Sequence, residues 1–277
     1  MTRLYTCNLI LAVPVRGVPA LIEKAVDCIK FAPATMDVFF NEFKAAEHRV
    51  PFDRIKLINS ISQFDGDGGI TSVALYDAAS TPKRPTPFFR ARIDLTLSGE
   101  YPILTLEWVA HESVDYLIDD HCVIRLFVGG HAEILSCIAF DQDDAFEQSQ
   151  AQDQRTTLQK LLRTDYWGRS ETVFGMTFIA APIMIFGEGF EQVIPRASLL
   201  KSDKARTLKI AGKTFVEVTL TDLYGAPAQG RAAQQAFWKT VSLAKCIRTY
   251  RESEKRDFGA LLKQRAATFE AAKARKG

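Results

Sequence analysis

Sequence patterns typical of β-strands dominate the middle of this 277-residue chain. Beyond residue 225 the pattern is typical of helices. In residues 89–97, apolar side chains alternate with arginine, aspartate and threonine, which predicts a strand with one face in the core and the other in water. Residues 101–109 continue this sheet. Because the strands come in a run before the helices, the sequence predicts an α+β fold: a mostly antiparallel sheet packed with helices, and a long C-terminal helix.

The N-terminal region predicts one strand and two helices. Residues 4–15 form a largely apolar run rich in β-formers, which is typical of a strand buried on both faces. Pro19 stands at the first turn of a helical apolar stripe over residues 20–29. A second amphipathic helix is predicted over residues 36–43, where methionine and phenylalanine repeat at spacings of three and four.

A glycine pair predicts a β-hairpin near the centre of the chain. The pair at residues 129–130 separates two β-rich runs, residues 121–128 and 131–140, and both positions of such a turn tolerate positive φ. In the register that a two-residue loop sets, Cys122 lies across from Cys137.

A polar, acidic and glutamine-rich stretch over residues 141–154 is expected to be an exposed connection. It divides the chain into an α+β half over residues 1–150 and an α+β half over residues 151–277 that ends in a basic helix, unless the two form one continuous domain. The second half is expected to contain a buried strand over residues 173–185 and a hairpin around residues 211–213.

Composition favours a globular protein with a substantial core, since 47% of the residues are hydrophobic. The chain has no apolar run of about 18 residues, and its first residues lack the pattern of a signal peptide. We therefore expect a cytoplasmic protein that does not bind a membrane. Five cysteines without a Cys-x-x-Cys spacing predict neither a disulfide framework nor a thiolate zinc site.

Charge is distributed unevenly along the chain. Residues 107–154 contain eleven acidic residues against one basic residue, whereas residues 231–277 contain twelve basic residues against four acidic ones. The acidic segment is either a solvating surface or a docking face for a basic partner. The basic segment is either an ordinary solvated helix, which we favour, or a nucleic-acid surface. The two segments could also pair with each other.

Short motifs that resemble metal or phosphate loops each lack a required residue. An EF-hand loop beginning at Asp65 needs glycine and glutamate where the chain has Ile70 and Tyr76. A phosphate-binding loop ending at Gly212 needs an earlier glycine where the chain has Thr207. We therefore expect no cofactor, no bound metal and no catalytic residue.

One histidine-rich region keeps an enzymatic alternative open. His111 and Glu112 begin like a metalloprotease helix, but Asp115 stands where the second histidine is needed. Metal ligation and acid-base catalysis both need convergent groups of these types. The candidate residues for a metal-dependent or acid/base enzyme are His111, Glu112, Asp115, Asp119, Asp120 and His121.

Residues 178–200 (FIAAPIMIFGEGFEQVIPRASLL), the hairpin that follows and residues 234–238 (QQAFW) resemble bacterial immunity proteins that neutralise polymorphic toxins. The shared pattern is an apolar strand, Phe-Gly, an aromatic residue and Ile-Pro before a short helix. The resemblance covers residues 178–238. It implies a stand-alone cytosolic inhibitor without enzymatic activity.

The leading hypothesis is a non-catalytic immunity protein that binds a cognate toxin with a basic surface. An acidic face would make this contact, and its residues are Glu112, Asp115, Asp119, Asp120, Asp141, Asp143 and Asp144. The alternatives are the enzyme described above and a nucleic-acid-binding module that uses the basic C-terminal helix.

Overall fold

A ten-stranded antiparallel sheet forms the body of the protein. The computed structural model describes residues 2–11, 18–29, 31–40, 47–62, 70–78, 90–98, 101–111, 134–149, 171–173, 176–210 and 212–253. The strands of the sheet are β1 (Thr2–Leu11), β2 (Thr35–Phe40), β3 (Glu47–Pro51), β4 (Ile70–Tyr76), β5 (Ala91–Ser98), β6 (Tyr101–His111), β7 (Ile134–Asp141), β10 (Ile183–Phe186), β11 (Ala205–Ile210) and β12 (Lys213–Thr219). Their order is β11-β12-β10-β7-β1-β6-β5-β4-β2-β3.

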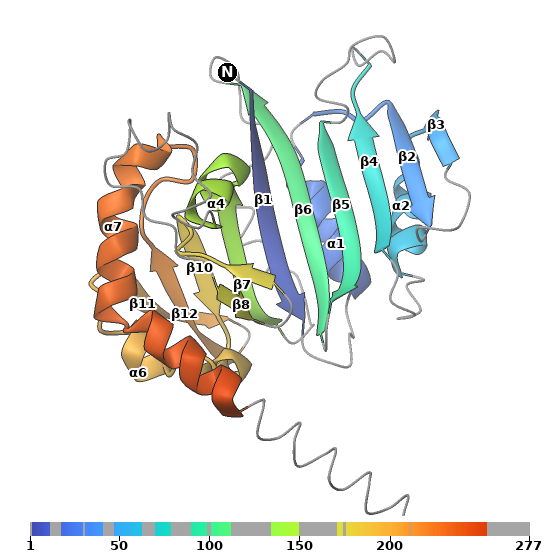
Figure 1. Cartoon of the computed structure of the whole chain (residues 1–277). Coiled ribbons are helices and arrows are strands. Elements are labelled where there is room, and N and C mark those ends of the chain that lie inside the picture. The colour runs from blue at the N-terminus through green and yellow to red at the C-terminus, as the bar shows by residue number, and fades with distance from the viewer. Residues whose placement is uncertain are drawn as a thin grey trace, which may run out of the picture.

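The helices lie on both faces of this sheet. They are α1 (Val18–Asp27), α2 (Arg54–Ser62), α4 (Gln142–Ser149), the 3-10 helix η1 (Glu188–Gln192), α6 (Arg196–Leu199) and α7 (Pro227–Thr240). Figure 1 shows α1 and α2 behind the N-terminal strands, while α7 lies over the C-terminal strands on the opposite face. The predicted α+β class with a mostly antiparallel sheet is confirmed. In the described part of the chain, no helix is long and apolar enough to cross a membrane.

Strand β1 lies in the middle of the sheet, where it pairs with β6 on one side and with β7 on the other. The pairing of β7 with β10 brings strands from residues 1–150 and from residues 151–277 into one sheet. As its apolar sequence predicts, β1 is buried on both faces. Its residues Tyr5, Cys7 and Leu9 belong to one hydrophobic core, and Ile10 belongs to the other.

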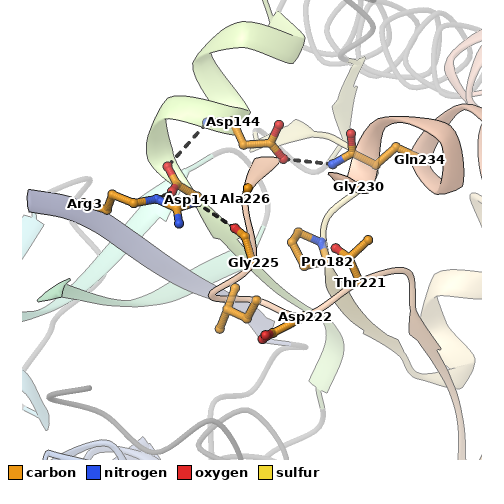
Figure 2. A pocket seen from close by; sticks show the side chains of 11 residues that line it. Arg3, Asp141, Asp144, Pro182, Thr221, Asp222, Gly225, Ala226, Gly230 and Gln234 are labelled. Atoms are coloured by element: carbon orange, nitrogen blue, oxygen red, sulfur yellow. Dashed lines mark hydrogen bonds and ion pairs between the residues drawn. The ribbon is translucent and has the colours of Figure 1, made fainter. Parts of the chain in front are cut away.

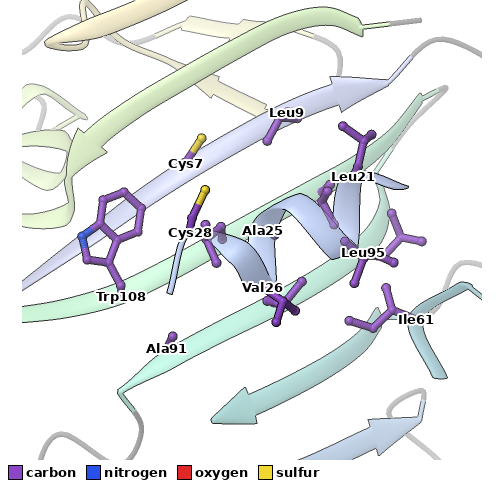
Figure 3. Packing of buried hydrophobic residues seen from close by; sticks show 14 of the residues in the cluster. Cys7, Leu9, Leu21, Ala25, Val26, Cys28, Ile61, Ala91, Leu95 and Trp108 are labelled. Carbon is purple, nitrogen blue, oxygen red and sulfur yellow. The ribbon is translucent and has the colours of Figure 1, made fainter. Parts of the chain in front are cut away.

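The first core lies between the N-terminal strands and the helices α1 and α2. Figure 3 shows Leu21, Ala25 and Cys28 of this region directed at the strands that carry Leu9 and Trp108. Spacings of three and four put these α1-side residues on one helical face, and Pro19 in the first turn sets the helix start. The predicted helix over residues 20–29 is therefore confirmed for most of its length.

The second core lies on the opposite face, beneath α7. Phe178, Phe186 and Phe190 pack together there, with the rings of Phe186 and Phe190 4.8 Å apart. Phe237 and Trp238 of α7 cover them. The residues that carry the resemblance to immunity proteins are thus largely core residues.

The predicted helix over residues 36–43 is wrong, because residues 36–40 belong to β2; residues 41–43 lie outside the described part of the chain. Met36 and Val38 alternate into the first core, and β2 pairs with β3 on one side and β4 on the other. Two neighbouring strands satisfy the backbone hydrogen bonds of a segment rich in β-formers. The aromatic spacing of three and four had suggested a helix.

The predicted hairpin around residues 129–130 is also wrong in its register. Cys137 of β7 lies across from Leu9 on one side and from Ile185 on the other. Both edges of β7 are therefore occupied, and Cys122 does not lie across from Cys137. Residues 121–128 themselves lie outside the described part of the chain.

The second predicted hairpin is confirmed. Ile210 pairs with Lys213 around a two-residue turn, and Gly212 has a φ of +80°, which glycine adopts without steric cost. The predicted strand over residues 173–185 is divided into β8 (Glu171–Val173), β9 (Met176–Phe178) and β10. Strands β8 and β9 form a separate two-stranded sheet.

Two expectations about helices need correction. The start of the predicted exposed connection is the helix α4. The predicted long C-terminal helix is interrupted: α7 ends at Thr240, Ser242 has a positive φ of 53°, and residues 243–253 are helical again. A positive φ at a non-glycine residue breaks the helical hydrogen-bond pattern.

Candidate functional site

A row of polar side chains crosses β4, β5, β6 and β1 on the face opposite α1 and α2. We call it the polar face and define it as Thr6, Asn8, Ser72, Arg92, Asp94, Thr105 and Glu107. Alternation along β5 and β6 sends Ile93 and Leu106 into the first core and their neighbours to this opposite face. Cross-strand pairing then sets Arg92 beside Glu107.

Arg92 bridges the two carboxylates of the polar face. Its Nε donates to Asp94 Oδ2 over 2.9 Å, and its Nη2 lies 2.8 Å from Glu107 Oε2. The amide of Gln142, the first residue of α4, donates to Glu107 Oε1 over 2.9 Å and to Thr6 Oγ1 over 2.7 Å. Glu107 therefore has a partner for each oxygen, whereas Asp94 Oδ1 is buried without a hydrogen-bond partner.

Burial makes ionisation of both carboxyls unfavourable. Asp94 and Glu107 are each 7% exposed, although the sequence predicted that this face of β5 lies in water. Burial raises the pKa of Asp94, against the opposing effects of Arg92 and Ser72. Burial also raises the pKa of Glu107, and the nearby Asp94 adds to that rise. The guanidinium of Arg92 thus pairs with two partly desolvated carboxylates.

The polar face keeps some contact with solvent. The side chain of Arg92 is 37% exposed, and Asn8 and Thr105 are half-buried. Thr105 donates its hydroxyl hydrogen to the Asn8 side-chain oxygen over 2.8 Å, which links β6 to β1. The cluster is therefore reachable from outside along the middle of these strands.

A second polar group lies on the outer strands β2, β3 and β4. The hydroxyl of Tyr76 donates to Asp37 Oδ2 over 2.8 Å, and the backbone N–H of Arg49 donates to Asp37 Oδ1 over 2.6 Å. The Arg49 guanidinium lies over the Tyr76 ring. Burial and the neighbouring Asp37 raise the pKa of Tyr76 to about 12. These contacts fix the outer strands to one another.

A third group joins the start of β1 to α4 and α7, and we call it the charge clamp. It consists of Arg3, Asp141, Asp144, Arg231 and Gln234. Arg3 Nε pairs with Asp141 over 2.5 Å and also donates through its other nitrogens to the carbonyls of Tyr224 and Gly225 (Figure 2). Asp141 in turn accepts from the backbone N–H groups of Asp143 and Asp144, as a helix N-cap does.

Asp144 forms the other end of the charge clamp. It pairs with Arg231. Gln234 Nε2 donates to it over 2.8 Å (Figure 2). A small opening lies beside these residues, lined also by Pro182, Thr221 and Gly230. Asp141 and Asp144 are neutralised by Arg3 and Arg231, which suits a structural contact between α4 and α7.

The charge clamp changes the interpretation of the acidic segment. Asp141 and Asp144 are each 2% exposed and form ion pairs within the chain, so these two residues do not form an exposed acidic face. Asp143 is exposed. Arg231 belongs to the basic C-terminal segment, so at this point the acidic and basic segments pair with each other.

The remaining sequence candidates lie at or beyond the edge of the described chain. His111 ends β6, opposite Thr2. Within the ranges that the structure describes, no three histidine, cysteine, aspartate or glutamate side chains are grouped to hold a metal. The other candidates, Glu112, Asp115, Asp119, Asp120 and His121, lie outside those ranges.

Sequence reasoning missed the polar face. Alternation in residues 89–97 identified the strand and the side on which Arg92 and Asp94 lie, but it did not indicate their burial. Glu107 was counted only as one charge of the acidic segment. Its position beside Arg92 follows from the β5–β6 register, which a hairpin prediction for these two strands could have supplied.

Comparison with known proteins identifies no family for this chain. No family model matches it, and no curated protein matches it. Among solved structures, the Pseudomonas aeruginosa T6SS protein PA0821 is 11% identical, with a TM-score of 0.46 over 87% of this chain and 73% of that chain. One chain of the crystal structure of the toxic C-terminal tip of CdiA from Pseudomonas aeruginosa in complex with immune protein is 12% identical, with a TM-score of 0.29 over 50% of this chain and 86% of that chain. At these values the likenesses carry no argument about function.

Proposed function

We propose that this chain is a non-catalytic binding protein that neutralises a bacterial toxin by direct contact, as an immunity protein does. The observation that carries the proposal is the polar face. It gathers charged and hydrogen-bonding side chains on the side of the sheet away from α1 and α2, and the Arg92 side chain, Asn8 and Thr105 keep contact with solvent there. Such groups give a protein interface its specificity and its speed of association.

The arrangement of charge supports a binding role. The buried carboxylates of the charge clamp form ion pairs with Arg3 and Arg231, and those of the polar face form ion pairs with Arg92. These pairs stiffen the sheet, and a rigid surface loses little conformational entropy when a partner binds. The sequence resemblance over residues 178–238 supports the same proposal independently of the polar face.

Toxin neutralisation can be tested in two steps. Tagged protein is purified from the native host, and the proteins that copurify with it are the candidate partners. Each candidate is then expressed in a sensitive bacterium, alone and together with this chain. The proposal predicts that one partner stops growth when expressed alone and that this chain restores growth. If no bound protein is toxic, or if growth stays arrested when this chain binds, the proposed function is wrong.

A second candidate is a nucleic-acid-binding module. Three exposed cations, Lys239, Lys245 and Arg248, lie along α7 and the helical residues that follow it. Binding through these residues should weaken steeply with salt, because phosphate contacts release counterions. Mobility-shift assays of the full chain and of a variant in which Lys239, Lys245 and Arg248 are replaced by alanine, at two salt concentrations, test this candidate.

A further inference from the structure

We propose that the polar face is a receptor for a cationic side chain of the partner protein, which enters beside Arg92 and binds Asp94 Oδ1. The inference rests on the proposed function and assigns the surface and the partner chemistry for it. The partner group is a guanidinium or an ammonium carried by a basic segment.

The first argument is the number of charges. Asp94 and Glu107 share Arg92, so the cluster contains two carboxylates and one cation. Glu107 is additionally held by Gln142, but no second donor reaches the Oδ1 atom of Asp94. A buried carboxylate oxygen without a donor is unfavourable, and a second cation would supply both the donor and the missing charge.

The second argument is access. Asp94 is 7% exposed, but the neighbouring Arg92 side chain is 37% exposed. An incoming side chain can therefore lie against Arg92 on its solvent side without disturbing the first core. Because Asp94 Oδ1 is itself buried, the cation reaches this atom when the Arg92 side chain shifts. Thr105 and Asn8, which are half-buried in the same row, supply further hydrogen-bonding groups at the entrance.

The third argument concerns the kind of cation. Divalent metals prefer several oxygen ligands, and the described residues contain no group of three metal-ligating side chains. A single free carboxylate oxygen next to hydroxyl and amide groups suits a hydrogen-bonding cation such as a guanidinium. A basic protein segment also agrees with the basic toxin surface predicted from the sequence.

The main experiment measures the affinity of the captured partner for two isosteric variants. Asp94→Asn removes the charge at the polar face, and Asp143→Asn removes an exposed charge on α4. The inference predicts at least about tenfold weaker binding for Asp94→Asn and less than about twofold change for Asp143→Asn. Thermal unfolding of both variants confirms that each is folded at the assay temperature.

A second measurement does not need the partner. The full chain is titrated with N-acetylargininamide and with its neutral citrulline analogue while backbone amide signals of residues 92–96 and 105–107 are followed by NMR. The inference predicts saturable shifts with the arginine compound only, and their loss in Asp94→Asn. Equal responses to both compounds, or a saturable response only to magnesium or calcium, would overturn it.

The two proposals fail in different ways. If the partner is neutralised by wild-type protein and by Asp94→Asn with equal affinity, the inference about the polar face is wrong and the proposed function stands. If no toxin is neutralised, the proposed function is wrong, and the arginine titration alone decides whether the polar face binds a cation.

Discussion

Asp143 and Asp144 are adjacent in the sequence but have opposite environments. Asp143 is exposed, whereas Asp144 is 2% exposed and pairs with Arg231. Removing one partner of a buried ion pair leaves the other charge without compensation. We therefore expect Asp144→Ala to lower the free energy of unfolding by about 3 kcal/mol or more. Urea denaturation measures this change.

The matched control is Asp143→Ala, whose effect on the free energy of unfolding should stay within about 0.5 kcal/mol, apart from a small loss at the start of α4. Similar losses in the two variants would contradict the assignment of Asp144 to the charge clamp. They would indicate that the acidic segment is a uniformly solvated surface.

Asp94 predicts a pH dependence of stability. Its pKa in the folded protein is raised above the ordinary value of 3.8, mainly by burial. The contribution of this carboxyl to stability is therefore fully present below pH 3.8 and is lost as the pH rises through the raised pKa. Asparagine has no proton to lose, so Asp94→Asn should gain stability relative to wild type as the pH rises from acid to neutral.

Urea unfolding of wild type and Asp94→Asn across this pH range measures the difference between their free energies. The prediction concerns the slope of that difference, because Asn also removes one contact of Arg92 at every pH. If the difference instead changes in favour of wild type as the pH rises, the charge of Asp94 is already balanced by its partners in the free protein. That result would contradict the proposal for the polar face.

At the scale of elements, two glycines permit strand pairing for different reasons. A Cβ at Gly187 would lie 2.3 Å from the backbone oxygen of Ile134, whereas a Cβ at Gly212 would meet nothing within 4 Å. Gly212 instead has a positive φ. Gly212→Ala should cost about 1 kcal/mol of unfolding free energy, and Gly187→Ala about 2 kcal/mol or more because β7 and β10 must separate.

Thermal and urea unfolding of these two alanine variants provide the comparison. Gly212→Asn is the control, because asparagine tolerates a positive φ better than alanine and should recover part of the loss. Equal losses for Gly187→Ala and Gly212→Ala would show that the close approach of Gly187 to Ile134 does not limit the pairing of β7 with β10.

Local sequence patterns predicted where helices and strands lie better than they predicted which strands pair. Alternation identified β5, the Pro19 stripe identified α1, and the turn at Gly212 identified the β11–β12 hairpin. The partners of β7 are β1, more than 120 residues before it, and β10, about 40 residues after it, and no local signal specifies such a pairing. For the same reason the ion pair between Asp144 and Arg231 could be anticipated only as a general attraction between an acidic and a basic segment.

At the scale of the whole molecule, β1 should make folding cooperative. It contributes to both cores, and it holds β6 and β7 in one sheet. Trp108 reports on the first core and Trp238 on the second. In variants in which Trp167 and one of these two tryptophans are replaced by phenylalanine, fluorescence should give the same unfolding midpoint, as expected for a single cooperative unit. Two separate midpoints would show that the halves unfold independently.

The most direct test of the account is a titration of the captured toxin's activity with this chain. Neutralisation by direct contact through the polar face predicts inhibition that is complete at a one-to-one ratio for wild type and for Asp143→Asn. For Asp94→Asn it predicts inhibition only at a clear excess. Full toxin activity in the presence of excess wild-type protein would contradict the account.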